Sequence, residues 1–227
     1  MKYTNLFFDI DNTLLDFDAS EKKSLQKVYN NMNMDFDDVD LSHYRNINES
    51  MWRSYERGEM TIEEIFDTRF TKVFKAYGKD VDGILVERIY REYLNNRHDV
   101  IDGAEELLGT LSKKYSIYAV TNGLAETQYQ RLKDSGLHKY FSGIFPSSEV
   151  GHKKPDIEYF QYVFSKIENF EPKSGLVIGD NLLSDIYGGI NAGLDTCWYN
   201  IRGVEKDTEI IPNYEIKQLE ELYEILD

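Results

Sequence analysis

The sequence has little cysteine, little proline and no long apolar run. Its single cysteine, Cys197, cannot form an internal disulfide, which fits a reducing compartment. The four prolines exclude a proline-rich linker. No apolar stretch approaches the length of a membrane span, and the N-terminal residues lack the apolar region and cleavage site of a signal peptide. The sequence therefore predicts a cytoplasmic protein that does not enter a membrane.

Basic residues are also scarce relative to acidic ones. The 26 Lys and Arg residues stand against 41 Asp and Glu residues, which gives a formal net charge of −15. Such a surface repels nucleic-acid backbones and anionic membranes, so we expect neither as a partner. A small phosphorylated metabolite remains compatible, because a local lysine, helix N-termini and a bound cation reverse the field inside a pocket.

The apolar residues that are present follow two different periodicities. A mostly apolar stretch over 5–10, with the acidic Asp9 near its end, predicts a buried parallel strand. From about 19 to 97 the apolar and aromatic residues have helical spacing, and no strand is evident. Within this stretch Thr61 and Glu64 match a capping box.

Beyond Gly103 short apolar segments alternate with helical ones. The predicted strands cover 116–120, 143–146, 176–178 and 196–199, and the predicted helices cover 104–113, 126–135, 156–167, 184–192 and 219–226. Alternation of this kind predicts an α/β fold, a doubly wound parallel sheet with helices on both faces. We expect a core of 1–15 and 98–227, with an all-helical insert of 16–97.

In such a sheet ligands bind at the carboxyl ends of the strands, so the polar residues at those ends are the candidate site. Asp9 and Asp11 end the first strand and can face one substrate, where one carboxylate attacks phosphorus and the other moves protons. Alternatively, the pair is a turn with a solvated acid. Thr121 and Asn122 follow the second strand with groups that suit a phosphoryl oxygen, although they also suit an ordinary helix N-cap.

Two further sets of residues complete the candidate site. Lys154, directly before Pro155, can balance negative charge in a transition state, although a solvated surface lysine is the alternative. Asp180 and Asp185 follow the strand at 176–178 and, together with Asp9, offer the oxygen ligands that Mg²⁺ prefers. N-capping of the next helix is the alternative for these two acids.

Taken in order, DIDNT, VTNG, KP and GDNLLSD resemble the four motifs of the haloacid dehalogenase (HAD) superfamily. The resemblance covers essentially the whole predicted core. It implies a Rossmann-like core with a helical C1-type cap. It also implies that Asp9 is a nucleophile forming an aspartyl-phosphate, and that Asp11 is the general acid/base. Thr121 and Lys154 would bind phosphate, and Asn122 would shape the phosphate loop.

The same resemblance implies a magnesium cofactor. Its ligands would be the carboxylates of Asp9 and Asp180 and the main-chain carbonyl of Asp11, with Asp185 bound directly or through water. A finer match links MWRSYERGEMT, VTNGLAETQYQRLKDSGLHKYF, SSEVGHKKPD and GGINAGLDTCWYN to the pyrimidine 5′-nucleotidase (YjjG-type) branch. That branch dephosphorylates nucleoside 5′-monophosphates such as UMP and dUMP, and the cap would select the substrate.

Cap residues that would contact the base are less defined. The candidates are the aromatic residues Trp52, Tyr55, Phe66 and Phe70 and the arginines Arg53, Arg57 and Arg69. The aromatic residues either stack on a base or form the hydrophobic core of the cap itself.

Other activities stay open besides a nucleoside-monophosphate phosphatase. They are a broad-specificity sugar-phosphate phosphatase, a phosphomutase, a haloacid dehalogenase and a non-catalytic phosphate-sensing module. Asp11 argues against a dehalogenase, because that reaction has no alkoxide to protonate. Asp11 and the large insert argue against the sensing module. Either a monomer or a homodimer is compatible with the sequence.

Overall fold

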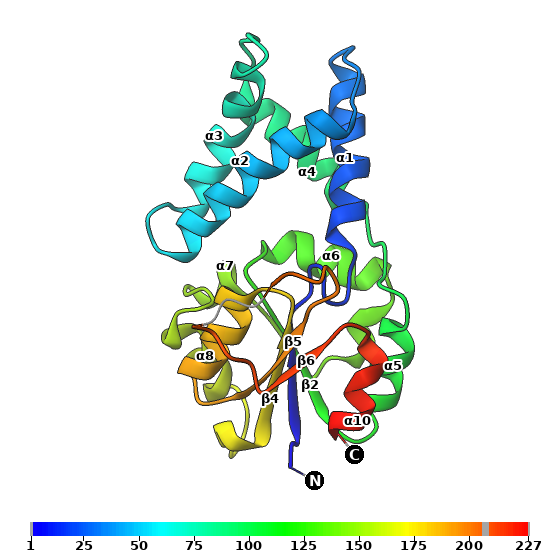
Figure 1. Ribbon diagram of the computed structural model, residues 1–227, viewed down its shortest axis with the longest axis vertical. Coiled ribbons are helices and arrows are strands. Elements are labelled where there is room, and N and C mark those ends of the chain that lie inside the picture. The colour runs from blue at the N-terminus through cyan, green and yellow to red at the C-terminus, as the bar shows by residue number, and fades with distance from the viewer. Residues whose placement is uncertain (1, 206–208, 227) are drawn as a thin grey trace. The chain divides into compact units, whose positions relative to one another are not determined.

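The computed structural model describes residues 2–205 and 209–226 (Figure 1). The chain forms two compact units, one of Met1–Phe17 with His98–Asp227 and one of Asp18–Arg97. The division expected from the sequence, a catalytic core of 1–15 and 98–227 and a cap of 16–97, stays a prediction. In the described part of the chain no helix combines the length and the apolar character needed to cross a membrane.

The first unit is built on a six-stranded sheet in the order β3-β2-β1-β4-β5-β6. The strands are β1 (Asn5–Phe8), β2 (Ser116–Thr121), β3 (Gly143–Pro146), β4 (Gly175–Gly179), β5 (Asp195–Tyr199) and β6 (Tyr214–Ile216). Every pairing of neighbours is parallel. The strand order reverses between β1 and β4, where an open parallel sheet leaves a crevice for a ligand.

Helices of this unit cover both faces of the sheet (Figure 1). They are α5 (Ala104–Leu111), α6 (Ala125–Asp134), α7 (Ser147–Val150), α8 (Ile157–Ser165), α9 (Gly188–Asn191) and α10 (Leu222–Leu226). Shorter turns are the 3₁₀ helices η1 (Leu137–Tyr140), η2 (Pro172–Ser174) and η4 (Leu219–Glu221) and the π-helical η3 (Leu182–Tyr187).

Side chains alternate between the two faces of the sheet along each central strand, which explains why helices cover both faces. Leu6 and Phe8 of β1 pack in one buried cluster with residues of α5, α6 and α10. Phe7 packs in a second cluster with residues of α7 and α8. Because successive side chains of a strand point to opposite faces, a strand buried on both faces must be apolar throughout. The doubly wound, Rossmann-like fold expected from the sequence is confirmed.

The second unit is helical. It comprises most of α1 (Phe17–Asn31), then α2 (Asp38–Glu56), α3 (Ile62–Lys75) and α4 (Gly83–Asn95). The predicted capping box of Thr61 and Glu64 begins α3. The interior of the helical unit contains buried aromatic residues, namely Tyr29, Tyr44, Phe70, Phe74 and Tyr90.

The candidate cap residues therefore separate into groups. Phe70 belongs to the hydrophobic core of the helical unit. Trp52, Tyr55 and Phe66 are only partly buried, and Trp52 contacts the other two edge-on, with ring centroids 5.6 and 6.4 Å apart. Arg53 and Arg57 are exposed, whereas Arg69 is buried.

Several element bounds differ from those expected. The segment expected as a helix over 184–192 is divided into the π-helical η3 and the short α9. The strand β6 was not expected, because its three residues form a short edge strand without an apolar run. The four-residue helix α7 was also not expected. Neither addition changes the order of the central strands.

Candidate active site

Asp9 directly follows β1, at the edge of the sheet where the strand order reverses. Its backbone N–H donates to the carbonyl of Ile178 in β4 at 2.9 Å, so the residue is fixed between two central strands. The residue is only 7% exposed, and its Oδ2 accepts a hydrogen bond from the Thr13 hydroxyl at 3.4 Å. Burial, opposed by Lys154, raises the pKa of Asp9 to about 7.

Lys154 reaches this carboxylate from the segment between α7 and α8. Its Nζ donates to Asp9 Oδ1 at 2.7 Å, to Asp185 Oδ1 at 2.6 Å and to the carbonyl of Val120 at 2.8 Å. Burial acts to lower the pKa of Lys154, but the carboxylates of Asp185 and Asp9 raise it, so the group stays cationic. The neighbouring Lys153 pairs instead with Asp156, at 3.2 Å.

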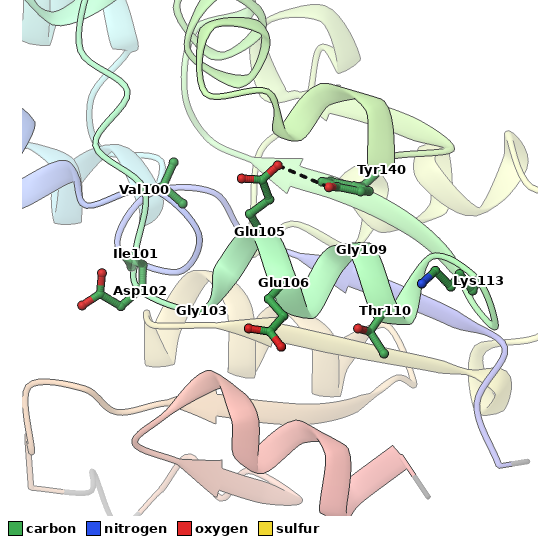
Figure 2. A pocket seen from close by; sticks show the side chains of 10 residues that line it. All are labelled: Val100, Ile101, Asp102, Gly103, Glu105, Glu106, Gly109, Thr110, Lys113 and Tyr140. Atoms are coloured by element: carbon green, nitrogen blue, oxygen red, sulfur yellow. Dashed lines mark hydrogen bonds between the residues drawn. The ribbon is translucent and has the colours of Figure 1, made fainter.

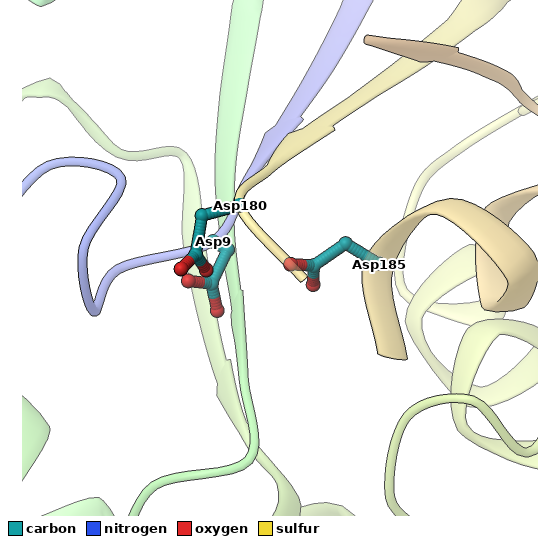
Figure 3. A group of neighbouring side chains, drawn as sticks. All are labelled: Asp9, Asp180 and Asp185. Atoms are coloured by element: carbon teal, nitrogen blue, oxygen red, sulfur yellow. The ribbon is translucent and has the colours of Figure 1, made fainter. Parts of the chain in front are cut away.

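Asp180 directly follows β4, and Asp185 lies in η3, which comes next in the chain. In Figure 3 Asp9 and Asp180 lie together at the ends of their strands, and Asp185 points toward them from η3. One carboxylate oxygen from each of the three lies within 4.8 Å of the others. Gly179 permits this arrangement, because a Cβ at that position would overlap the Asp185 side chain.

This carboxylate cluster fits a divalent cation. The Lys154 ammonium contacts two of the three acids, Asp9 and Asp185, so one lysine serves a cluster of three acidic side chains. Burial, reinforced by Asp9 and Asp185, raises the pKa of Asp180 well above its ordinary value. Clustered carboxylate oxygens are the donors that Mg²⁺ prefers. A bound cation would remove the mutual repulsion of the three groups.

Thr121 and Asn122 lie at the end of β2, beside this cluster. The Thr121 hydroxyl oxygen accepts hydrogen bonds from Gly123 N–H at 3.1 Å and from Gln128 Nε2 at 2.9 Å, and it also has a proton to donate. The Asn122 amide binds the main chain of Lys154. Its Oδ1 accepts from the N–H of Lys154 at 2.8 Å, and its Nδ2 donates to the Lys154 carbonyl at 2.9 Å. Asn122 therefore holds the main chain of Lys154 in place.

Asp11 lies beside the cluster, and its side chain is 29% exposed. Its two carboxylate oxygens accept hydrogen bonds from Arg131 and Gln128, both on α6. The sequence analysis did not single out these two residues, nor Thr13. One indication of the two α6 residues was present in their spacing. Gln128 and Arg131 lie three positions apart and so share one helix face, which also carries the buried Leu132.

A surface groove of about 830 Å³ lies elsewhere on the same unit, along one side of α5. Figure 2 shows its lining, which includes Asp102, Glu105 and Glu106 and a single cationic residue, Lys113. None of the candidate site residues lines it. Because acidic side chains predominate there, the groove does not suit an anionic substrate.

Comparison with known proteins agrees with this geometry. The haloacid dehalogenase-like hydrolase family matches residues 6–199. The chain belongs to that family and is therefore an enzyme of the hydrolase class.

Individual relatives match the whole chain. The magnesium-bound crystal structure of the HAD-hydrolase YfnB from Bacillus subtilis has a TM-score of 0.96 and 45% identity, and covers 100% of both chains. The pyrimidine 5′-nucleotidase PynA of Streptococcus pneumoniae is 36% identical, over 100% of this chain and 96% of its own. The pyrimidine 5′-nucleotidase YjjG of Escherichia coli is 31% identical, over 100% of this chain and 99% of its own.

Proposed function

We propose that the protein is a Mg²⁺-dependent phosphatase that transfers the phosphoryl group of a monoester first to Asp9 and then to water. One observation carries the proposal. The buried Asp9 carboxylate lies at the strand-order reversal, with Lys154 at 2.7 Å and two further carboxylates within metal-binding distance. A nucleophile, a charge-balancing cation and a set of metal ligands thus meet at one point.

The chemistry follows in two steps. In the first, an Asp9 oxygen forms a bond to phosphorus, the bond from phosphorus to the ester oxygen breaks, and Asp11 gives its proton to that oxygen. In the second, water attacks phosphorus while the Asp11 carboxylate accepts a proton from it. The bond between Asp9 and phosphorus then breaks. One monoester and one water give one alcohol and one phosphate, and both aspartates return to their starting forms.

Other residues bind and orient the phosphoryl group. Asp9, Asp180, Asp185 and the main-chain carbonyl of Asp11 would hold Mg²⁺, which when bound offsets the negative charge of the phosphate and the carboxylates. The cation in the Bacillus subtilis relative supports this assignment. The Thr121 hydroxyl and the Lys154 ammonium would bind phosphate oxygens, and Asn122 would keep Lys154 in position.

We further propose nucleoside 5′-monophosphates as substrates, with pyrimidine nucleotides such as UMP and dUMP preferred. Two relatives that match the full chain are pyrimidine 5′-nucleotidases, which supports this choice. The helical unit Asp18–Arg97 would act as the cap that selects the base and closes over the site. The interdomain movement described for the Bacillus subtilis relative supports a mobile cap.

A phosphate-release screen tests the proposal. It would compare UMP, dUMP, purine nucleotides and sugar phosphates in the presence of Mg²⁺, with chloroacetate and halide detection in parallel. The highest kcat/KM is expected for a pyrimidine nucleotide. A sugar phosphate as best substrate would instead favour a broad-specificity phosphatase, and halide release would favour a dehalogenase. Oxygen-18 from water in the released phosphate would count against a phosphomutase. The cytoplasmic location and the choice between monomer and homodimer stay predictions.

A further inference from the structure

Two side chains of α6 hold the carboxylate of Asp11 from the same side. Arg131 Nη1 lies 2.5 Å from Asp11 Oδ1, and Gln128 Nε2 lies 2.7 Å from Asp11 Oδ2. Gln128 is 1% exposed and Arg131 is fully buried, although both are polar. Because they lie three positions apart on one helix, they reach Asp11 as a pair.

The pair also connects Asp11 to the phosphate-binding end of β2. Gln128 Nε2 donates to the Thr121 hydroxyl oxygen at 2.9 Å, and Gln128 Oε1 accepts from Arg131 Nη1 at 3.2 Å. Gly123 makes room for this arrangement, since a Cβ there would overlap the Gln128 side chain. Asp11, Thr121 and the two α6 residues therefore form one continuous hydrogen-bonded group.

The arrangement leaves Asp11 able to act on a substrate. A carboxylate has about four lone-pair positions, and the two α6 residues use one on each oxygen. The side chain of Asp11 is 29% exposed, whereas that of Arg131 is not exposed at all. Burying a guanidinium group costs several kcal/mol even when it is paired, so apolar residues would serve stability as well or better. A role in orienting Asp11 accounts for a buried arginine at this place.

We propose that Arg131 and Gln128 are positioning residues for Asp11, which fix the direction in which its carboxylate meets the ester oxygen. The proposal rests on the proposed phosphatase function. Loss of either residue should therefore lower kcat/KM most for substrates whose leaving oxygen needs a proton. It should lower kcat/KM only slightly for substrates whose leaving group departs as a stable anion.

Phenyl phosphate and p-nitrophenyl phosphate separate these cases. They are similar in shape, but nitrophenolate leaves without protonation much more readily than phenolate. The quantity compared is kcat/KM with Mg²⁺, because it covers the steps up to release of the phenol and so isolates the acid step from the water step. The variants are Arg131→Met and Gln128→Met. Their controls are Lys133→Met and Gln130→Met, at exposed positions of the same helix.

For Arg131→Met, kcat/KM is expected to fall by about 10²-fold on phenyl phosphate and by less than about 5-fold on p-nitrophenyl phosphate. Gln128→Met should show the same selectivity with a loss of about 10-fold on phenyl phosphate. Because Asp11 also activates water, both variants should show a burst of nitrophenolate before the steady state. Both controls should match the wild-type protein.

Equal losses on the two substrates, without a burst, would show a merely structural role and overturn the proposal. Circular dichroism checks folding, and if Arg131→Met does not fold, Gln128→Met and Arg131→Lys provide the comparison. A wild-type protein that releases phosphate from neither aryl ester, nor from any nucleotide or sugar phosphate of the screen, would instead refute the proposed function. If Asp11→Asn is leaving-group selective and the α6 variants are not, only the positioning role fails.

Discussion

Lys154 and Asp9 are 145 positions apart in the chain, yet the ammonium nitrogen of one lies 2.7 Å from a carboxylate oxygen of the other. The same nitrogen lies 2.6 Å from Asp185. Asp180 adds a third carboxylate to the group. Removing any one of these charges should therefore alter turnover, metal binding or stability in a way that identifies its role.

Substitution of the nucleophile should abolish turnover and keep the fold. Asp9→Asn retains the shape of the side chain but cannot attack phosphorus, so kcat should fall by at least about 10⁴-fold. The measurement is phosphate release with Mg²⁺, with circular dichroism to confirm folding. Asp67→Asn, at an exposed position of α3, is the matched control and should leave activity unchanged. Activity near the wild-type value in Asp9→Asn would rule out Asp9 as the nucleophile.

Loss of the shared ammonium group should destabilise the metal-free protein. Lys154→Met leaves Asp9 and Asp185 buried without their cation. Breaking such a pair should lower the free energy of unfolding by about 3–5 kcal/mol. Urea denaturation in EDTA measures this change.

The matched control for that experiment is the adjacent lysine. Lys153 pairs with the partly exposed Asp156, so Lys153→Met should cost less than about 1 kcal/mol. Addition of Mg²⁺ should recover more stability in Lys154→Met than in the wild-type protein, because the cation would offset the same uncompensated carboxylates. Equal losses for the two variants would mean that Lys154 does not neutralise the cluster.

The metal prediction concerns both activity and stability. EDTA should abolish phosphate release and Mg²⁺ should restore it. At a Mg²⁺ concentration of 100 times its Kd, binding should add about 2.7 kcal/mol to the free energy of unfolding. Asp180→Asn should remove most of that gain. Glu106→Gln, in the acidic groove along α5, should keep it. Turnover that persists in EDTA would contradict a role for the metal.

The sequence predicted those parts of the molecule that depend on local pattern. Apolar runs ending in Asp9 and Asp180 marked two strands, and parallel strands bring their carboxyl ends to one edge of a sheet. The place of Thr121 at the end of β2 followed from the same pattern. In each case the residue lies at the end of a predicted strand, so its place follows from the strand itself.

Contacts that depend on the packing of distant elements could not be predicted in this way. Arg131 reaches Asp11 across 120 positions, and on its own helix it looks like an ordinary polar residue. The Asn122 amide binds the main chain of Lys154, which no spacing in the sequence indicates. The edge strand β6 depends on pairing with β5 and has only three residues.

Substitution of Arg69 tests whether this arginine of the helical unit contacts substrate or stabilises the unit. It is 3% exposed, and its Nη2 lies 2.7 Å from both carboxylate oxygens of Glu87. Its Nη1 donates to Asn48 at 2.7 Å. Among the described residues, Arg69→Met would leave the buried Glu87 with Arg91, at 2.9 Å, as its cationic partner. The free energy of unfolding should therefore fall by about 3 kcal/mol, at the lower end of the range for a broken buried pair.

A double variant separates lost pairing from lost volume. Arg69→Met with Glu87→Leu should regain part of that stability, because no carboxylate is then left buried without its partner. The control is Arg53→Met, which removes an exposed pair with Glu49 and should cost less than about 0.5 kcal/mol. Urea denaturation measures stability, and KM is measured for UMP and phenyl phosphate in the folded variants. A buried structural arginine should change the KM for both substrates alike. If Arg69→Met instead keeps its stability and raises the KM for UMP alone, Arg69 is a contact of the nucleotide.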